Sequence, residues 1–236
     1  MSLPHLNGKL LSPLDPNPVS LIGPALAPGP LVLVGDHAGR AFPSVFGDMG
    51  VSGSDRGRHI ALDLGIEQLG RLLSERLKAP FIAQVYSRLV VDCNRDPAAP
   101  SAMPEVSDGT TIPANHGLSP EEREERVRAI HEPYHAAISA LLNAREAAGL
   151  PTILVALHSF TPVFGGEQRV WDAGVLHGGP GDAYGRRVLA LLQERGGWVI
   201  GDNQPYEFNE RDYTIPRHAF PRGLPWLELE VRQDRL

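Results

Sequence analysis

The stretch Leu31-Val32-Leu33-Val34-Gly35-Asp36-His37-Ala38-Gly39-Arg40 decides the fold class of this chain. It opens with a run of aliphatic residues, which is typical of a strand that is buried on both faces of a parallel sheet. Polar residues follow at the carboxyl end of the strand, where open α/β sheets place their ligands. We therefore expect an α/β domain with a site that includes His37.

Strands and helices alternate along the rest of the chain. Apolar runs predict strands, and apolar residues spaced three or four apart predict helices. Ser119 and Glu122 form a capping-box pattern at the start of one helix, and Pro133 predicts a kink inside it. The strands are expected at 81–86, 89–91, 153–157, 198–200 and 226–231, and the helices at 55–77, 119–148 and 182–195.

Length and composition limit the classes of protein to consider. We expect residues 1–236 to form one α/β domain, with a proline-rich arm at 1–30. A formal net charge of −6 argues against nucleic acid as the main partner, because phosphate binding needs a concentrated basic face. Cys93 is the single cysteine, which excludes a disulfide framework. The lack of a secretion signal and of a long apolar run predicts a cytoplasmic protein that does not enter membranes.

Two histidines are expected at one edge of the sheet. His37 and His158 each follow a predicted buried strand, and the carboxyl ends of parallel strands meet at one edge. Asp63 stands on the polar stripe of the predicted helix 55–77, where it can face the same edge. Two imidazoles and one carboxylate are a common ligand set for catalytic zinc. The pattern predicts a metal site; the alternative is that each histidine only binds loop backbone.

Several short blocks of the sequence are informative when they are taken together. They are Asp36–Arg40, His59–Gly65, Tyr86–Arg95, Pro133–His135, His158–Pro162, Gly201–Tyr206 and Glu228–Asp234. In this order they are similar to successive blocks of the N-formylglutamate amidohydrolase family, over roughly residues 31–234. Because the blocks match in one order, the resemblance is specific.

The resemblance implies a fold and a reaction. The family is similar in architecture to zinc carboxypeptidases, so we expect a three-layer α/β/α domain around a mixed, mostly parallel sheet. The implied reaction is hydrolysis of N-formyl-L-glutamate to formate and L-glutamate, a late step of histidine breakdown, with one divalent metal ion, zinc, as the cofactor. A broader deacylase of small N-acyl amino acids would keep the same metal site.

The resemblance also implies roles for individual residues. The metal ligands are His37, Asp63 and His158, the general base is Glu230, and the substrate-binding residues are Arg88, Asn94, Arg95 and, lining the pocket, His135. Zinc carboxypeptidases place a ligand acid three residues after the first histidine, whereas Arg40 occupies that position here. This departure favours an arrangement like that of cell-wall amidases, with the acid further along the chain at Asp63.

Elementary chemistry supports these residue types and leaves alternatives open. A carboxylate near a metal can pass a proton from water to the leaving amine, and an arginine offers two parallel donors to a carboxylate. Glu230 shares its strand face with Glu228, so the alternative for Glu230 is an exposed strand residue. The alternative for Arg88 and Arg95 is a surface ion pair with a nearby aspartate.

A second zinc motif is the literal match of residues 131–135, His-Glu-Pro-Tyr-His, to H-E-x-x-H. Pro133 argues against it, because proline distorts the helical turn on which both histidines would have to lie. His218, in the loop before the last predicted strand, is a further catalytic candidate that would contact the oxyanion. The remaining hypotheses are a zinc protease that uses His131 and His135, and a non-catalytic binding module that retains the fold.

Overall fold

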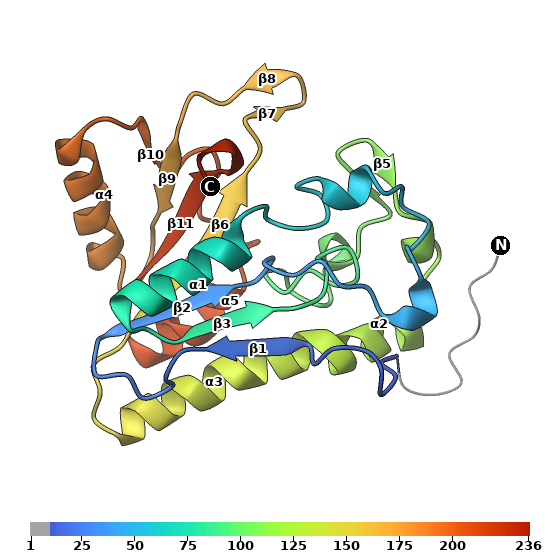
Figure 1. Ribbon diagram of the computed structural model, residues 1–236, viewed down its shortest axis with the longest axis horizontal. Helices are drawn as coiled ribbons and strands as arrows, with labels where there is room; N and C mark the ends of the chain where they lie inside the picture. The colour runs from blue at the N-terminus through green and yellow to red at the C-terminus, as the bar shows by residue number, and fades with distance from the viewer. Residues whose placement is uncertain (1–9) are drawn as a thin grey trace.

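The computed structural model describes residues 10–236 and contains a seven-stranded sheet (Figure 1). In spatial order the strands are β1 (Val19–Ile22), β3 (Phe81–Gln84), β2 (Leu31–Gly35), β6 (Ile153–Phe160), β11 (Trp226–Arg232), β9 (Ala173–Leu176) and β10 (Ile200–Asp202). The four strands β3, β2, β6 and β11 run parallel, whereas β1 is antiparallel to β3 and β9 is antiparallel to β11. This mixed, mostly parallel sheet confirms the predicted fold class.

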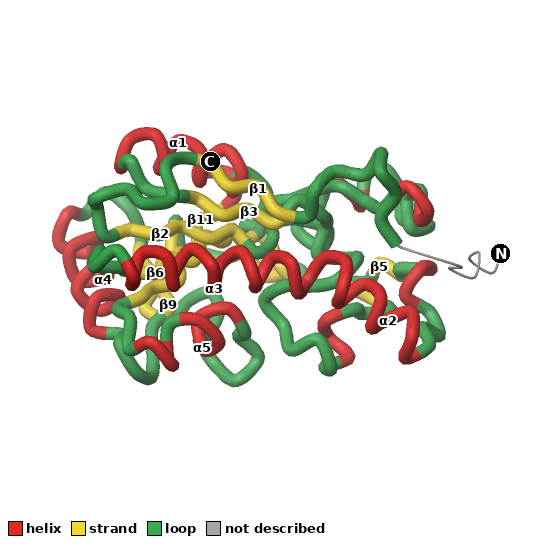
Figure 2. The backbone as a smooth tube through the Cα atoms, turned by 90° about the horizontal axis from the view of Figure 1, so that it is seen from below, coloured by secondary structure: helices red, strands yellow, loops and turns green. Residues whose placement is uncertain are grey.

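Helices cover both faces of the sheet (Figures 1 and 2). One face carries α1 (Ile66–Leu77) and α4 (Ala183–Arg195), and the other carries α3 (Glu132–Ala147) and α5 (Thr214–His218). Successive strand residues point to opposite faces. Leu33 accordingly belongs to the apolar core that includes Ile66 and Leu189. Its neighbour Val34 belongs to the core that includes Ile138. The expected α/β/α layers are present.

The predicted helix 55–77 is wrong in its first half. The helix begins only at Ile66, and Gly65 before it has a φ of 82°, in the left-handed region that disfavours residues with a side chain. The residues before Gly65 cross the end of the sheet, where the amide N–H of Asp63 donates to the carbonyl of His37 at 2.9 Å. Asp63 is therefore positioned by a loop bound beside β2 and not by helical periodicity.

Strand boundaries also differ from the prediction. The strand expected at 153–157 continues to Phe160, because Ser159 and Phe160 keep their pairing with β11, so His158 lies within β6. The strand expected at 89–91 is absent, since a turn closes there with the amide of Val90 bound to the carbonyl of Ser87. The strand expected at 198–200 is found at Ile200–Asp202.

Two strands of the sheet were not predicted. β1 lies in the proline-rich arm, where it pairs with β3 between flanking prolines, and the first nine residues of that arm lie outside the described part of the chain. β9 follows a loop, and its pattern Ala-Gly-Val-Leu is too short to separate a strand from a turn. Both owe their conformation to pairing with a strand distant in sequence.

The predicted helix 119–148 is divided. The capping box is present: the amide of Glu122 donates to the Ser119 hydroxyl, and the amide of Ser119 donates to the Glu122 carboxylate. α2 (Pro120–Arg126) leads into a π-helical segment, Val127–His131, and then into α3. Pro133 has no amide hydrogen, so it cannot donate the helical hydrogen bond to the carbonyl one turn earlier. This accounts for the wider π-helical segment just before it.

Two short hairpins stand in the long loops. β4 (Val106–Ser107) pairs with β5 (Thr110–Thr111), and β7 (Val163–Phe164) pairs with β8 (Glu167–Gln168). The second hairpin extends directly from the carboxyl end of β6 (Figure 1). Both hairpins therefore belong to the end of the domain at which the polar residues gather.

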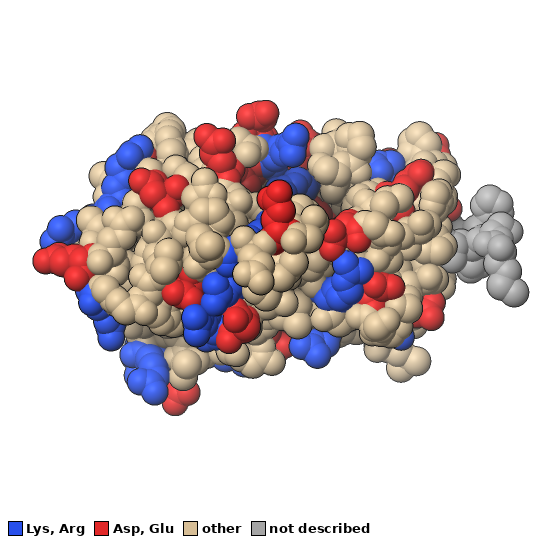
Figure 3. All heavy atoms as spheres, turned by 90° about the horizontal axis from the view of Figure 1, so that it is seen from above, with Lys and Arg blue, Asp and Glu red and all other residues tan. Residues whose placement is uncertain are grey.

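Charged side chains are mixed on the surface seen in Figure 3. Lysines and arginines lie among aspartates and glutamates on that face, without a broad area of one sign. Within residues 10–236, no helix has the length and apolar character needed to cross a membrane.

Candidate active site

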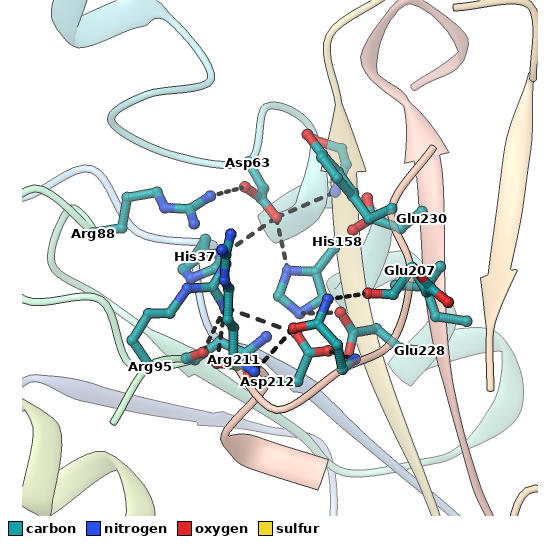
Figure 4. Close-up of a pocket in the computed structure, with 15 residues that line it drawn as sticks. His37, Asp63, Arg88, Arg95, His158, Glu207, Arg211, Asp212, Glu228 and Glu230 are labelled. Carbon is teal, nitrogen blue, oxygen red and sulfur yellow. Dashed lines mark hydrogen bonds and ion pairs between the residues drawn. The ribbon is translucent and has the colours of Figure 1, made fainter. Parts of the chain in front are cut away.

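A cavity of about 230 Å³ lies at the carboxyl ends of β2, β6 and β11 (Figure 4). It brings together most of the residues predicted to act as one site, namely His37, Asp63, Arg88, Asn94, Arg95, His158 and Glu230. The wall also contains polar residues for which no role was predicted, namely Ser159, Tyr206, Glu207, Asn209, Arg211 and Asp212.

The wall formed by residues 206–212 depends on a glycine. At Gly174 in β9, a Cβ atom would lie 1.7 Å from the carbonyl oxygen of Gln204. A side chain at this position would therefore displace the loop that begins at Gln204. Gly174 is also the residue of β9 that pairs with Glu230 of β11. The glycine thus lets the loop approach the sheet beside the acidic strand and close the cavity.

Asp63 lies between the two histidines predicted as ligands. Its Oδ2 atom is 2.9 Å from Nδ1 of His158 and 3.5 Å from Nδ1 of His37. The amide N–H of Ser159 also donates to Oδ2, at 3.2 Å. All three proposed ligands are buried, and each offers one atom within 4.8 Å of the others. One carboxylate oxygen and two imidazole nitrogens therefore converge on one point.

A further carboxylate stands behind each of these histidines. Oδ1 of Asp92 is 2.6 Å from Nε2 of His37, and Oδ2 of Asp36 is 3.2 Å from Nε2 of His158. Histidines that bind metal commonly have such a carboxylate on the other ring nitrogen, which fixes the tautomer and the ring orientation. Nδ1 of His37 is buried and has no hydrogen-bond partner. The donor set therefore fits a divalent metal ion held through both Nδ1 atoms.

The sheet register explains why Asp36 is near His158. Val34 of β2 pairs with Ala156 of β6, so two residues further on Asp36 lies beside His158. Burial raises the pKa of Asp36, but the hydrogen bond and the charge of His158 outweigh it and lower the pKa to about 2. The side chain is therefore ionised at neutral pH, as an orienting carboxylate must be.

Arg88 links Asp63 to Asp92, the carboxylate behind His37. Its guanidinium donates to Asp92 Oδ2 at 2.6 Å and to Asp63 Oδ1 at 3.2 Å. Burial raises the pKa of Asp63, but the charge of His37 and the hydrogen bond of His158 outweigh it and hold the pKa well below its usual range. An ion pair between Arg88 and an aspartate is present, but it lies in the cavity wall and not on the surface.

Two glutamates of β11 complete the acidic side of the cavity. Glu230 pairs with His158 across the parallel strands, and Glu228 shares its face. Both are buried, and the Oε2 atom of each has no hydrogen-bond partner. Burial, with the charge of Asp63, raises the pKa of Glu230 to about 7 against the opposing charge of His158. Burial also raises the pKa of Glu228 well above its usual value.

Asn94 and Arg95 enter the cavity from the segment after β3. Oδ1 of Asn94 accepts hydrogen bonds from the amides of Tyr213 and Thr214, at 2.9 and 3.0 Å, so only its NH₂ group remains for a ligand. Nη1 of Arg95 donates to the carbonyl oxygens of Asn94 and Arg211. These bonds hold both side chains against the loop that carries Asp212 and Tyr213.

The structure places His135 and His218 behind this wall and not among the residues that line the cavity. Nδ1 of His135 and Nε2 of His218 are 2.9 Å apart, and Nε2 of His135 bonds to the carbonyl of Cys93 at 2.9 Å. His131 bonds through Nε2 to the carbonyl of Arg95 at 3.2 Å. Burial, with the charge of Arg217, lowers the pKa of His218 to about 3, so its ring is neutral at pH 7.

The histidines of the H-E-x-x-H match are thus engaged with backbone carbonyls. Within residues 10–236, the groups of three side chains that are arranged to hold a metal ion are His37, Asp63 and His158, and His158, Glu228 and Glu230. Neither group includes His131 or His135.

The sequence model of the family described as N-formylglutamate amidohydrolase matches residues 29–236. The chain belongs to this family. It is an amidohydrolase, and the resemblance of its sequence blocks is confirmed. The match includes every residue discussed in the cavity.

Solved structures of similar proteins agree with the fold. A gene product from Agrobacterium tumefaciens is 35% identical, with a TM-score of 0.91 over 96% of this chain and 89% of that one. An N-formylglutamate amidohydrolase from Ralstonia eutropha is 22% identical, with a TM-score of 0.64 over 92% of this chain and 86% of that one. No curated protein matches the chain.

Proposed function

We propose that this amidohydrolase uses one divalent metal ion, zinc, to hydrolyse N-formyl-L-glutamate to formate and L-glutamate. The observation that carries the proposal is the convergence of the Nδ1 atoms of His37 and His158 on Asp63, with a carboxylate behind each ring. Buried polar atoms are normally paired, so the unpaired Nδ1 of His37 beside two buried carboxylates supports a role in binding a cation.

His37, Asp63 and His158 would hold the ion. Bound there, zinc would polarise the scissile carbonyl and lower the pKa of water toward about 7. With the ion bound, the carboxylates Asp36 and Asp92 would hold both rings in the tautomer that offers the Nδ1 lone pair to it.

Glu230 would carry the proton. Its carboxylate accepts a proton from water as the water oxygen bonds to the carbonyl carbon. The carbon–nitrogen bond then breaks as Glu230 gives that proton to the amine nitrogen. A pKa of about 7 suits both halves of this transfer, because the group gains and loses a proton at little cost near neutral pH. The products are formate and the free amino acid.

Arginines in the cavity wall favour a substrate with carboxylates. Arg95 and Arg211 both line the cavity, and Arg95 donates to the carbonyl oxygen of Arg211. Arginine offers planar paired donors to a carboxylate, and glutamate carries two such groups. Arg88 lies next to the ligand Asp63 and would meet the carbonyl oxygen of the amide. N-formylglutamate is also the substrate in the name of the family that matches the chain.

The test is a turnover assay with the purified chain and added zinc. N-formyl-L-glutamate should give formate and L-glutamate in equal amounts, measured separately by an enzymatic formate assay and by amino-acid analysis. The enantiomer N-formyl-D-glutamate is the matched control and should react far more slowly. If zinc-loaded protein hydrolyses no N-acyl amino acid in a panel of acyl groups and side chains, the proposal is wrong.

A further inference from the structure

A second cavity, of about 280 Å³, adjoins the site described above. The two cavities share Arg88, Arg95 and Tyr206 as a common wall. The second cavity opens toward the two hairpins, with Ser107 from β4 and Phe164 from β7 among its lining residues. The proposed metal ligands and Glu230 all line the first cavity, so the reaction proposed above assigns no role to the second one.

The second cavity has an apolar floor and an aromatic rim. Ile60 and Leu89 are buried and form part of its wall, whereas Phe164 and Tyr206 are 45% and 38% exposed. The ring of His59 meets that of Phe164 edge to face, with 6.0 Å between centroids. Pockets that bind small organic groups combine such apolar and aromatic surfaces with few polar groups.

The charges of this cavity are already paired. Asp108 accepts a hydrogen bond from Arg58 at 2.6 Å, and Asp92 is bound to Arg88 at the same distance. Burial, with the charge of Arg58, lowers the pKa of His59 against the opposing charge of Asp108, so its ring is neutral at pH 7. The surface away from Arg95 therefore suits an uncharged group.

The position of Arg88 determines which part of the substrate points into the second cavity. Arg88 borders both cavities and bonds to Asp63, so a carbonyl oxygen that meets Arg88 would lie on the side of the site that faces the second cavity. Glu230, which gives its proton to the leaving amine, lines the first cavity alone. In that orientation the amino acid would occupy the first cavity, and the substituent on the carbonyl carbon would point toward the second.

We propose that the second cavity binds the acyl group of the substrate, and that the enzyme accepts N-acyl-L-glutamates whose acyl group is an uncharged aliphatic chain or aromatic ring. This inference rests on the hydrolytic function proposed above and extends it from formyl to larger acyl groups. A formyl carbon carries only hydrogen and leaves the second cavity unfilled.

The test compares kcat/KM for N-benzoyl-, N-butyryl- and N-formyl-L-glutamate in matched pairs of variants. Ser107→Phe introduces a bulky ring into the second cavity, and its control Val106→Phe introduces the same ring at the exposed neighbour in β4. Phe164→Ala removes one of the two rings of the aromatic rim, and its control Val163→Ala alters the exposed neighbour in β7. Neither control residue contributes to either cavity.

We expect the wild-type enzyme to hydrolyse the benzoyl and butyryl compounds. Ser107→Phe and Phe164→Ala should each lower the ratio of benzoyl to formyl kcat/KM by about tenfold or more, the range typical for losing one apolar pocket contact. Val106→Phe and Val163→Ala should keep the wild-type ratio.

Three results would overturn the inference. The first is hydrolysis of the formyl compound without the two larger ones. The second is a ratio of benzoyl to formyl kcat/KM that is the same in Ser107→Phe as in the wild type. The third is a selective loss of N-formyl-L-phenylalanine hydrolysis in the same variants, which would place the amino-acid side chain in the second cavity. Failure to hydrolyse any compound would instead reject the proposed function together with the inference.

Discussion

The protein buries two groups of histidines, and they differ in how their nitrogen atoms are used. In the cavity, His37 and His158 each face a carboxylate on both sides, and Nδ1 of His37 is buried without a hydrogen-bond partner. In the histidine cluster behind the cavity, formed by His131, His135 and His218, His135 bonds through both nitrogens to neutral partners. The first group is arranged so that it could hold a cation, whereas the second binds backbone carbonyls.

The difference shows what separates a ligand set from a structural one. Both groups are buried, and the second even belongs to a sequence match for a zinc site. Within residues 10–236, carboxylates pair directly with the first group, whereas His131 and His135 bond to carbonyl oxygens. Buried histidines with neutral partners remain uncharged, while histidines among carboxylates are prepared for a positive ion.

The largest expected difference is between two alanine variants, each of which replaces one histidine of one group. His158→Ala should lose the bound metal, and kcat/KM should fall by more than the ~100-fold that loss of an orienting partner costs. His135→Ala should keep the metal. It should instead lower the free energy of unfolding by about 1–3 kcal/mol, because His218 and the carbonyl of Cys93 lose a partner. Metal content and urea unfolding of both variants check this, and metal loss in His135→Ala alone would reverse the two assignments.

Next in size is the effect of removing the proposed base. Glu230→Gln should lower kcat by about 10²–10⁴-fold with unchanged metal content, because the amide keeps the shape of the side chain but cannot take a proton. Glu228→Gln is the matched control, since it shares the strand and face. Steady-state kinetics with metal analysis decides between the two glutamates. A larger loss of kcat in Glu228→Gln than in Glu230→Gln would show that Glu230 is not the base.

A smaller effect should follow from altering an orienting carboxylate. Asp92→Asn should weaken metal binding by about 10–100-fold, because the amide no longer stabilises the required tautomer of His37. Asp96→Asn, at an exposed aspartate of the same segment, should leave metal affinity unchanged. Competition with a fluorescent zinc chelator measures both, and equal affinity for Asp92→Asn and wild type would remove Asp92 from the site.

The smallest effect concerns the histidine cluster and pH. The pKa of His218 is about 3 in the folded state and near 6.5 when unfolded, so its contribution to stability is complete above pH 6.5 and is lost as the pH falls toward 3. His218→Phe should reduce the loss of stability between pH 6.5 and 5.5 by about 1 kcal/mol. Glu228 and Glu230 also make the free energy of unfolding depend on pH, but their contribution is the same in both proteins. It therefore cancels when the variant is compared with the wild type. Urea unfolding at both pH values tests this, and parallel pH dependences would contradict it.

Sequence reasoning reached the fold and the centre of the cavity because those depend on local pattern. The aliphatic run before Asp36 identified β2, and the period of two in β11 correctly placed Glu228 and Glu230 on one face. Asp63 was expected to meet the histidines from a helix, but a loop brings it there.

Other parts of the site depend on contacts that no local pattern contains. The pairing of Asp36 with His158 follows from the register between β2 and β6. The position of His218 follows from how α5 packs on α3, and the entry of Arg211 into the cavity follows from the close approach of its loop to Gly174. Each requires the relative placement of segments far apart in the chain.

Metal content measured against turnover tests the central claim most directly. The protein is stripped with a chelator, its metal content is verified by elemental analysis, and zinc is returned in steps while hydrolysis of N-formyl-L-glutamate is followed. Activity should be absent at the start, rise in proportion to bound zinc and level off at one ion per chain. Wild-type turnover by protein verified as metal-free would contradict a hydrolytic metal site at His37, Asp63 and His158.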